Sequence, residues 1–241
     1  AKLLSAKSLN RILLKREDLQ TVFSFKIRGA YNKLLQLSPA QRAAGVIAAS
    51  AGNHAQGLAL AAQHLKVMAT IVMPRTTPSI KVDAVKRYKA KVVLCGDTYD
   101  EASARALKLV EEHGFHYIPP YDDPDVIAGQ GTVAVEILRQ HLADIEAVFI
   151  PVGGGGLCAG MAAYIKFVRP DIKLYAVEAE EAACLDAALK AGRRVILPQV
   201  GLFADGVAVA QIGKEPFKIL KHSLEGVITV SSDEILYLIP I

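Results

Sequence analysis

One lysine of this chain lies between two apolar side chains at the expected start of a helix. Lys26 follows Phe25 and precedes Ile27. A lysine held against apolar groups has a lowered pKa, because burial disfavours its charged form. A neutral amine can attack an aldehyde and form a Schiff base. Position alone favours a simpler interpretation, since most lysines in the first turn of an amphipathic helix are only solvated.

A second stretch with possible chemistry lies between an expected strand and an expected helix. It reads Ser50-Ala51-Gly52-Asn53-His54. Parallel α/β sheets bind ligands at the carboxyl ends of their strands, and a helix N-terminus offers unpaired N–H groups to an anion such as a carboxylate. An ordinary N-cap formed by Ser50 or Asn53 would explain the same residues without a ligand. The two interpretations are equally supported at this point.

Four consecutive glycines, Gly153 to Gly156, directly follow an expected strand and precede a helix. Such a run costs much backbone entropy, and a plain turn needs only one or two glycines. A row of backbone N–H groups pointing into one concavity is a common way to hold phosphate. The glycine run therefore favours a phosphate site over a tight turn.

The same glycines permit an alternative from another class. Gly154, Gly156 and Ala159 match a loose dinucleotide fingerprint, and Glu178 lies near the distance expected for a ribose-binding acid. An NAD-binding oxidoreductase is therefore the second hypothesis. It is weakened because it leaves Lys26 and the Asn53 loop without a role.

Composition limits the remaining possibilities. The chain has 241 residues, of which 52% are hydrophobic and 22% charged, with a net charge of +4. This is the composition of a globular protein, and so small a charge excess gives no reason to expect nucleic acid or a membrane as partner. No apolar run reaches the roughly 20 residues of a membrane-spanning helix. Three dispersed cysteines without a CxxC pair favour a reducing compartment over disulfides or structural zinc.

Short apolar runs alternate with amphipathic stretches, which is typical of a parallel α/β sheet. Strands are expected near residues 12–15, 46–49, 66–73, 92–94, 115–118, 147–150, 174–177 and 226–230. Helices are expected at residues 26–37, from 39, at 54–65, 78–88, 99–113 and 132–142, from 157, up to 189, at 214–223 and from 231. No linker interrupts the pattern, so any second domain must be interwoven with the first. The chain lacks an initiator methionine and stops within a helical pattern, so we expect a fragment.

A reactive amine, a carboxylate-binding loop and a phosphate loop together describe a site for pyridoxal 5'-phosphate and an amino acid. The three stretches closely resemble the fold-type II, or tryptophan-synthase-β-like, pyridoxal-phosphate enzymes. Within that family the chain looks like the biosynthetic threonine deaminases. The resemblance covers the whole chain in order, at Ser24 to Ala30, Ser50 to Gly57, Gly153 to Leu157, Val177 to Glu180, Gly192 to Pro198 and Val200 to Val209.

The resemblance implies which residues bind the cofactor. Lys26 would hold it through its amine and then act as the base at the substrate Cα. Phe25 would pack near the ring, and Asn53 would hydrogen-bond the 3-hydroxyl. Gly206 would line the cofactor from a later loop. The phosphate would be held by the backbone of Gly153, Gly154, Gly155, Gly156 and Leu157.

The resemblance also implies a substrate site and a fold. Ser50, Ala51, Gly52, Asn53 and His54 would shape the pocket for the substrate carboxylate. The fold would be α/β, with two interwoven three-layer domains and mostly parallel sheets. Residues 1–42 and 122–241 would form an incomplete large domain. Residues 43–121 would form a small domain that closes over the substrate.

The implied reaction is α,β-elimination of water from threonine, and more slowly from serine, giving 2-oxobutanoate or pyruvate and ammonium. It is the first step toward isoleucine. Similar serine racemases carry a serine as second base where this chain has Ala51, so elimination fits better than racemisation. Glu178 and Ala182 match two of the metal ligands of those racemases, but Cys184 replaces the third, so no divalent metal is expected, and a monovalent cation stays an open alternative.

The remaining expectations concern the whole protein. The family's residue beside the pyridine nitrogen and its isoleucine-sensing domain lie beyond residue 241. A catalytically silent fragment is therefore a third hypothesis. The family implies an amino acid substrate, a homo-oligomer of two or four chains, and a cytoplasmic location, or a plastid one in a plant.

Overall fold

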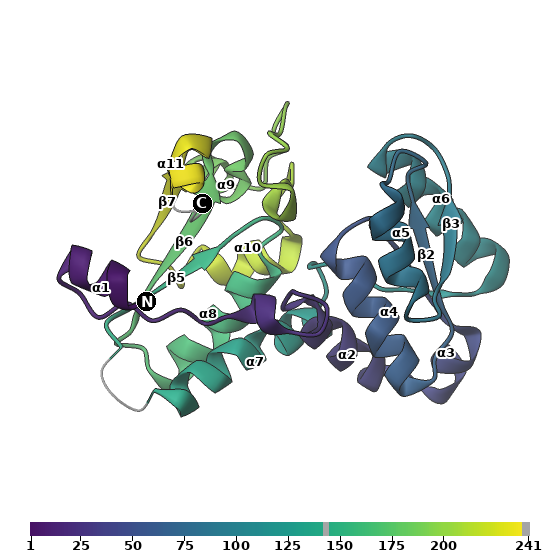
Figure 1. The fold of residues 1–241 in the computed structure, drawn as a ribbon, viewed down its shortest axis with the longest axis horizontal. Coiled ribbons are helices and arrows are strands. Elements are labelled where there is room, and N and C mark those ends of the chain that lie inside the picture. The colour runs from purple at the N-terminus through teal and green to yellow at the C-terminus, as the bar shows by residue number, and fades with distance from the viewer. Residues whose placement is uncertain (142–144, 238–241) are drawn as a thin grey trace.

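The computed structural model describes residues 1–141 and 145–237, which form two parallel sheets and the helices around them (Figure 1). The strands are β1 (Val46–Ala49), β2 (Ala69–Met73), β3 (Lys91–Leu94), β4 (His116–Tyr117), β5 (Ala147–Pro151), β6 (Lys173–Ala179) and β7 (Gly226–Val230). The helices are α1 (Lys2–Ser8), α2 (Lys26–Gln36), α3 (Pro39–Ala44), α4 (Asn53–Leu65), α5 (Ser79–Lys86), α6 (Tyr99–His113), α7 (Pro124–Gln140), α8 (Gly156–Val168), α9 (Cys184–Ala191), α10 (Lys214–Leu220) and α11 (Ser232–Tyr237). Short 3-10 turns are η1 (Glu17–Leu19), η2 (Glu180–Ala182) and η3 (Asp205–Val207). The predicted α/β class with parallel sheets is confirmed.

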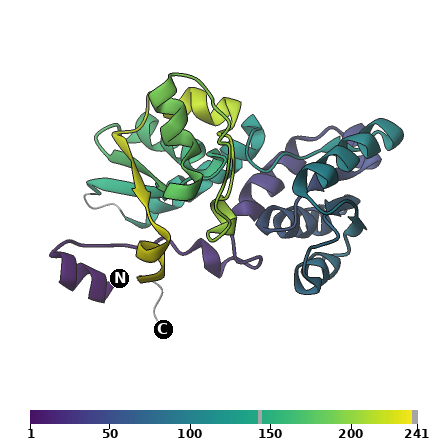
Figure 2. The same cartoon turned by 90° about the horizontal axis from the view of Figure 1, so that it is seen from above.

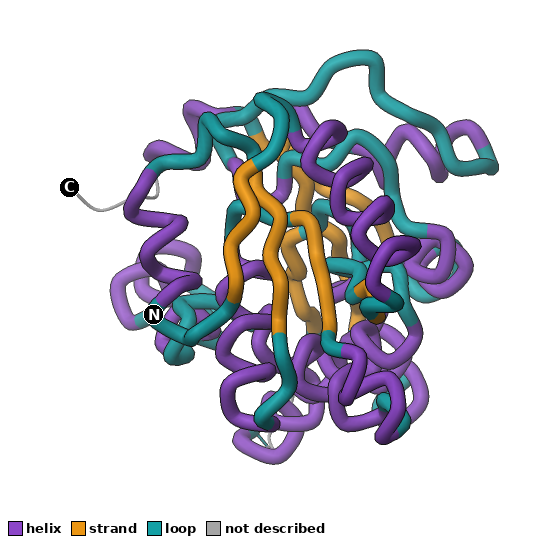
Figure 3. The backbone as a smooth tube through the Cα atoms, turned by 90° about the vertical axis from the view of Figure 1, so that its right-hand side faces the viewer, coloured by secondary structure: helices purple, strands orange, loops and turns teal. Residues whose placement is uncertain are grey.

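The four-stranded sheet has the order β3-β2-β1-β4, and every neighbouring pair is parallel. Side chains of a strand alternate between its two faces. Val46 and Ala48 therefore pack with α2, α4 and α5 on one face. Ile47 and Ala49 pack with α6 on the other. This part of the chain is a three-layer sandwich, with helices on both sides of the sheet (Figure 3).

The three-stranded sheet has the order β5-β6-β7 and is also parallel. Its core joins buried residues of β5 and β6, such as Ile150 and Leu174, to apolar residues of α7, α8, α9 and α10. Phe149 and Tyr175 alternate with these core positions, and their rings stack with centroids 5.2 Å apart. Phe149 remains 59% exposed.

Helices α2 and α7 lie between the two sheets (Figure 1). Helix α7 contributes to both cores, and α2 does so together with Phe25, the residue that precedes it. Leu34 and Val126 belong to the core of the four-stranded sheet, whereas Phe25 and Ile127 pack in the other core. The two helices cross closely, since a Cβ at Gly129 would lie 2.6 Å from the Cα of Gly29. The division into residues 1–42 with 122–241 and residues 43–121 stays a proposal.

The strand expected at residues 12–15 is wrong. No strand lies beside this segment among the described residues, and its backbone instead bonds to α1, with Ile12 N–H donating to Ser5 Oγ at 2.8 Å. Helix α1 lies at the end of the molecule opposite the four-stranded sheet (Figure 2). No helix in residues 1–141 and 145–237 is both long and apolar enough to cross a bilayer.

Helix α7 begins eight residues before the expected start at residue 132, and residue 142 lies outside the described part. The sequence contains a signal for this earlier helix start at residues 123 and 124. Asp123 is the N-cap, accepting from the N–H groups of Asp125 and Val126 at 2.9 and 3.1 Å, and a proline occupies the first turn. The glycines at 129 and 131 concealed it, because they serve close helix crossings and not turns.

Candidate active site

Lys26 is the first residue of α2 and is half-buried, with its amine turned toward the protein. The Lys26 N–H donates to Ser24 Oγ at 3.2 Å, and Nζ donates to the carbonyl of Pro120 at 2.8 Å. The ring centroid of Phe25 is 5.5 Å from Nζ. Burial lowers the pKa of Lys26 to about 8, because the charged form loses its hydration. About a tenth of such an amine is neutral at pH 7.

His54 lies next to this amine but is engaged elsewhere. Its ring is buried, and Nε2 donates to the carbonyl of Ile118 at 2.9 Å. Burial, and to a lesser extent the charge of Lys26, lowers the pKa of His54 to about 3. The imidazole is therefore neutral at physiological pH. Any contribution of His54 to carboxylate binding must come from its backbone N–H.

The N-terminus of α4 has no side-chain cap. Gly52 occupies the N-cap position, and Ser50 Oγ accepts the Gly52 N–H at 3.3 Å. Asn53 is the first helical residue, is exposed, and makes no side-chain hydrogen bond within the described ranges. Asn53 therefore does not cap α4, and the N-cap interpretation of this residue is wrong. Its amide and the first N–H groups of α4 are available to a ligand.

Helix α4 approaches Lys26 through a glycine. A Cβ at Gly57 would lie 2.9 Å from the backbone N of Ile27 and from the carbonyl carbon of Lys26. Only a residue without a side chain allows this contact. The Asn53 loop and the lysine are therefore brought together by direct helix packing. Ala51 is half-buried at this end of α4 and packs against the core of the four-stranded sheet.

The glycine loop connects β5 to α8, and two of its carbonyls are held by other segments. The Gly153 carbonyl accepts from Cys184 Sγ at 3.4 Å, and the Gly154 carbonyl accepts from the Gly213 N–H at 3.1 Å. In a trans peptide the following N–H points opposite to the carbonyl. The N–H groups of Gly154 and Gly155 thus point away from these anchors. Leu157 follows in the first turn of α8.

Gly154 and Gly155 are buried, yet their N–H groups donate no hydrogen bond in the described part of the chain. Buried backbone N–H groups are rarely unpaired, since losing water without a partner costs free energy. Two adjacent unpaired donors at the start of a helix form an anion site. Gly155 has a φ of 88°, which a residue with a side chain adopts only under strain.

Two other segments touch the glycine loop. A Cβ at Gly154 would overlap the ring of Tyr121, and a Cβ at Gly153 would lie 2.9 Å from the Cα of Val207. Gly206 directly precedes Val207, the residue that contacts the glycine loop. Among the described residues, no atom beyond its chain neighbours lies within 4 Å of a Cβ placed on Gly206 itself. Tyr121 follows Pro120, whose carbonyl holds Lys26. Residues 120 and 121 thus connect the amine to the glycine loop.

Sequence reasoning missed Pro120 and Tyr121. Both follow β4 at the carboxyl end of the parallel sheet, which is the position where α/β proteins bind ligands. That position was the available signal. It was not used because no charged or amide side chain marks these two residues.

Glu178 is buried, with 1% of its surface exposed. Its two carboxylate oxygens accept the N–H groups of Leu185 and Asp186, each at 2.9 Å, so it caps the start of α9. Burial raises the pKa of Glu178 to about 6. This carboxylate is occupied by the helix and unavailable to a ribose, which removes the acid that the NAD-binding hypothesis needs.

The weak metal candidates lie next to that cap. Ala182 is buried and Cys184 begins α9, where burial raises the pKa of its thiol to about 12. Within residues 1–141 and 145–237, no group of three or more His, Cys, Asp or Glu side chains is arranged to hold a metal ion.

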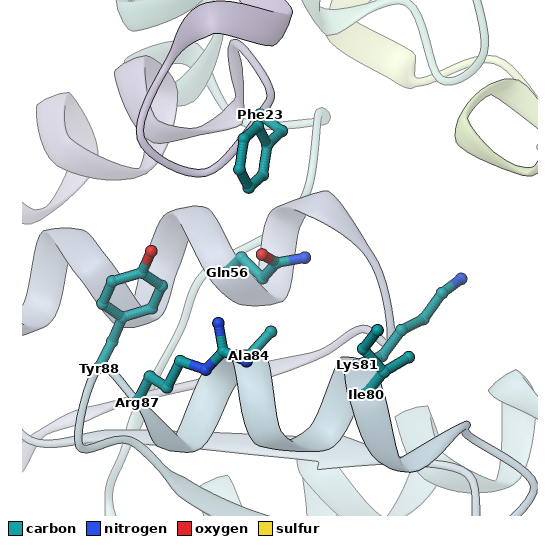
Figure 4. A pocket seen from close by; sticks show the side chains of 7 residues that line it. All are labelled: Phe23, Gln56, Ile80, Lys81, Ala84, Arg87 and Tyr88. Carbon is teal, nitrogen blue, oxygen red and sulfur yellow. The ribbon is translucent and has the colours of Figure 1, made fainter.

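A separate hollow of about 340 Å³ lies between α4, α5 and the loop before α2 (Figure 4). Its lining residues are Phe23, Gln56, Ile80, Lys81, Ala84, Arg87 and Tyr88. Lys81 Nζ also pairs with Asp205 at 3.0 Å, which links α5 to the turn η3 beside the glycine loop. The predicted cofactor residues line none of this hollow.

A family model described as "Pyridoxal-phosphate dependent enzyme" matches residues 1–240. The chain is 54% identical over 236 residues to a biosynthetic L-threonine dehydratase of Burkholderia multivorans. The matched region covers 97% of this chain and 46% of the relative. It is 55% identical over 235 residues to a biosynthetic, chloroplastic threonine dehydratase of Arabidopsis thaliana, covering 98% of this chain and 40% of the relative. The chain thus spans about half the length of the curated relatives it matches.

Solved structures that resemble this chain also include a threonine deaminase. The processed form of threonine deaminase isoform 2 from Solanum lycopersicum superposes with a TM-score of 0.95 at 52% identity, covering 97% of this chain and 68% of that one. Maize serine racemase superposes with a TM-score of 0.94 at 32% identity, and the match covers 98% of this chain and 71% of that one.

Proposed function

Because this chain belongs to the family of pyridoxal-phosphate-dependent enzymes, we propose that it converts threonine to 2-oxobutanoate and ammonium. Serine would react more slowly and give pyruvate and ammonium. The observation that carries the proposal is the half-buried Lys26 amine, connected through Pro120 and Tyr121 to a loop in which two buried glycines have unpaired N–H groups. The names of relatives of about twice its length support the choice of threonine and a place at the start of isoleucine synthesis.

The residues fit the cofactor. A neutral amine suits an aldehyde, and the N–H groups of Gly154 and Gly155, with those of the first turn of α8, suit a phosphate. The amide of Asn53 suits a hydroxyl on the ring, and Phe25 offers an aromatic face beside Lys26. When bound, pyridoxal phosphate supplies an electron sink that acidifies the substrate Cα.

The chain's own groups then perform three tasks. The N-terminus of α4, at Ser50 to His54, binds the substrate carboxylate through its N–H groups and its positive dipole end. Lys26 Nζ, with a pKa near the working pH, takes the proton from Cα. Ala51 supplies no second base, so protons exchange on one side of the substrate only. This combination favours loss of the β-hydroxyl as water over racemisation.

We further propose that the small domain, residues 43–121, closes over the bound carboxylate and excludes water. The contact of α4 with the backbone of Lys26 at Gly57 puts this domain beside the amine that it would cover. We also propose a homo-oligomer of two or four chains. A hollow of about 410 Å³ on α2 and α7 includes the partly exposed apolar residues Tyr31 and Leu35. Light scattering of a Tyr31→Glu variant would test this. The proposed location is the cytoplasm, or a plastid in a plant, where the Arabidopsis relative is named chloroplastic.

The test of the main proposal is spectroscopic. Protein loaded with pyridoxal phosphate should show a visible band that borohydride abolishes while Lys26 becomes covalently tagged, as read by mass spectrometry. Lys26→Ala should lose the band and the release of 2-oxo acid. A retained turnover in this variant would contradict the assignment.

A related reaction has its own support. The likeness to maize serine racemase keeps serine dehydration or racemisation as the second candidate. Assays of 2-oxo acid from threonine and serine, with chiral analysis of the remaining serine, distinguish the two. Formation of D-serine faster than pyruvate would favour the second candidate.

A further inference from the structure

Asp122 lies in the connection between β4 and α7, directly after the tyrosine that touches the glycine loop. Its two carboxylate oxygens accept the N–H groups of Lys214 and Glu215, both at 2.8 Å. These are the first two residues of α10, 92 and 93 positions further along the chain. Charge-assisted bonds of this length are among the stronger hydrogen bonds of proteins.

The start of α10 in turn holds the glycine loop. The Gly213 N–H donates to the Gly154 carbonyl at 3.1 Å. A Cβ at Gly155 would lie 2.9 Å from Pro216 and 2.6 Å from Ile212, so the loop rests directly on this turn. Gly213 itself fits closely, since its Cβ would lie 3.1 Å from Asp122 Cγ. Displacing the first turn of α10 would therefore rotate the peptide that follows Gly154.

We propose that Asp122 is a positioning residue for the cofactor phosphate. Its carboxylate fixes the first turn of α10, which fixes the Gly154 carbonyl, and the N–H of Gly155 is thereby aimed at the phosphate. The inference rests on the proposed function, because it requires that the glycine loop hold a phosphate. Asp122 touches no cofactor atom in this scheme and acts through residues 213–215. Its carboxylate also lies 4.0 Å from Arg194 Nη1, so removing it would free a positive charge, which could only favour phosphate binding.

The direction in which phosphate affinity changes when Asp122 is neutralised distinguishes positioning from simple charge repulsion. Asp122 is a negative charge near an anion site, so neutralising it by an electrostatic effect alone would strengthen phosphate binding. Positioning predicts the opposite result. Loss of the carboxylate loosens the turn and weakens the phosphate interaction even though a repulsive charge has been removed.

The experiment compares two aldehydes that differ only in the phosphate. Dissociation constants of pyridoxal phosphate and pyridoxal are measured by visible absorbance with apoprotein of the wild type, Asp122→Asn and Asp122→Ala. The ratio of the two constants isolates the phosphate contribution, because general damage to the site affects both ligands. We expect the phosphate preference to fall about three- to tenfold in Asp122→Ala and about twofold in Asp122→Asn, which keeps one acceptor.

Asp123 offers a matched control one residue away. It caps α7 instead, with the N–H groups of Asp125 and Val126, and pairs with Lys33 at 2.8 Å. Asp123→Asn removes the same charge without touching α10, so the phosphate preference should stay the same or rise. A similar fall in this variant would overturn the specific role of Asp122.

The outcomes separate the two proposals. An unchanged or increased phosphate preference in both Asp122 variants, with a normal visible band, overturns the positioning role and leaves the proposed function standing. A wild type that binds both aldehydes equally well overturns the phosphate loop itself. Absence of any band with either aldehyde refutes the proposed function together with this inference.

Discussion

The buried amine of Lys26 should make the stability of the apoprotein depend on pH in a way that one substitution can isolate. The pKa of Lys26 is about 8 in the folded state, against 10.5 for the free side chain. Keeping the charged amine buried at pH 7 therefore costs about 3 kcal/mol. Between the two pKa values the unfolded state binds more protons than the folded state, so the free energy of unfolding rises with pH.

The magnitude follows from the same two pKa values. Raising the pH from 7 to 9 should add about 1 kcal/mol to the stability of the wild type relative to a variant without the amine. Lys26→Met is that variant, because it keeps the length and apolar character of the side chain. Urea unfolding of both proteins at pH 7, 8 and 9 gives the difference, and the pH dependence of all other groups cancels.

Lys33 provides the control from the same helix. It pairs with Asp123 at 2.8 Å and Asp125 at 2.9 Å, and these partners raise its pKa above the ordinary value although burial opposes them. It stays protonated in both states from pH 7 to 9, so the stability difference between wild type and Lys33→Met should be flat. A flat difference for Lys26→Met as well would refute the lowered pKa, and with it the reason to expect a reactive amine.

Three further results are expected. Gly154→Ala should weaken pyridoxal phosphate binding more than tenfold, because its Cβ would overlap the ring of Tyr121; an unchanged absorbance titration would contradict the close contact. His54 should stay neutral down to about pH 4 by NMR, since its pKa is about 3, and a midpoint near 6 would contradict its burial. Arg28→Met should lower the free energy of unfolding in urea by about 2–4 kcal/mol. The reason is that the mostly buried Glu17, bonded to Arg28 at 2.7 Å, would lose its main partner. A decrease of less than about 0.5 kcal/mol would mean that water replaces the ion pair.

Local patterns in the sequence were sufficient for much of the site. The helix starting at Lys26 and the order strand, four glycines, helix are as predicted. Each is written in neighbouring residues, through apolar spacing and the conformational freedom of glycine. The lowered pKa expected for Lys26 from the flanking Phe25 and Ile27 agrees with the value of about 8.

Contacts between distant residues could not be predicted in this way. Pro120 meets Lys26 across 94 positions, and Asp122 meets Lys214 across 92. Neither pair has a sequence signal, because a backbone carbonyl and a helix N–H exist at nearly every residue. The spacing of Glu178 suggested a ribose ligand, but its carboxylate caps α9. Burial and hydrogen bonding, which decide that role, depend on the folded arrangement.

The sharing of α2 and α7 between two cores has a consequence for the nascent chain. The core of the four-stranded sheet includes Leu34 near its beginning and Val126 near its end. The second core, with the partly buried residues packed on it, begins with Phe25 and is completed only by Val227. Since domains usually fold as they leave the ribosome, the first core cannot close before α7 emerges, and Phe25 must wait for about two hundred later residues. During synthesis Phe25 therefore stays without its packing partners for much of translation, although α2 beside it can already pack in the first core.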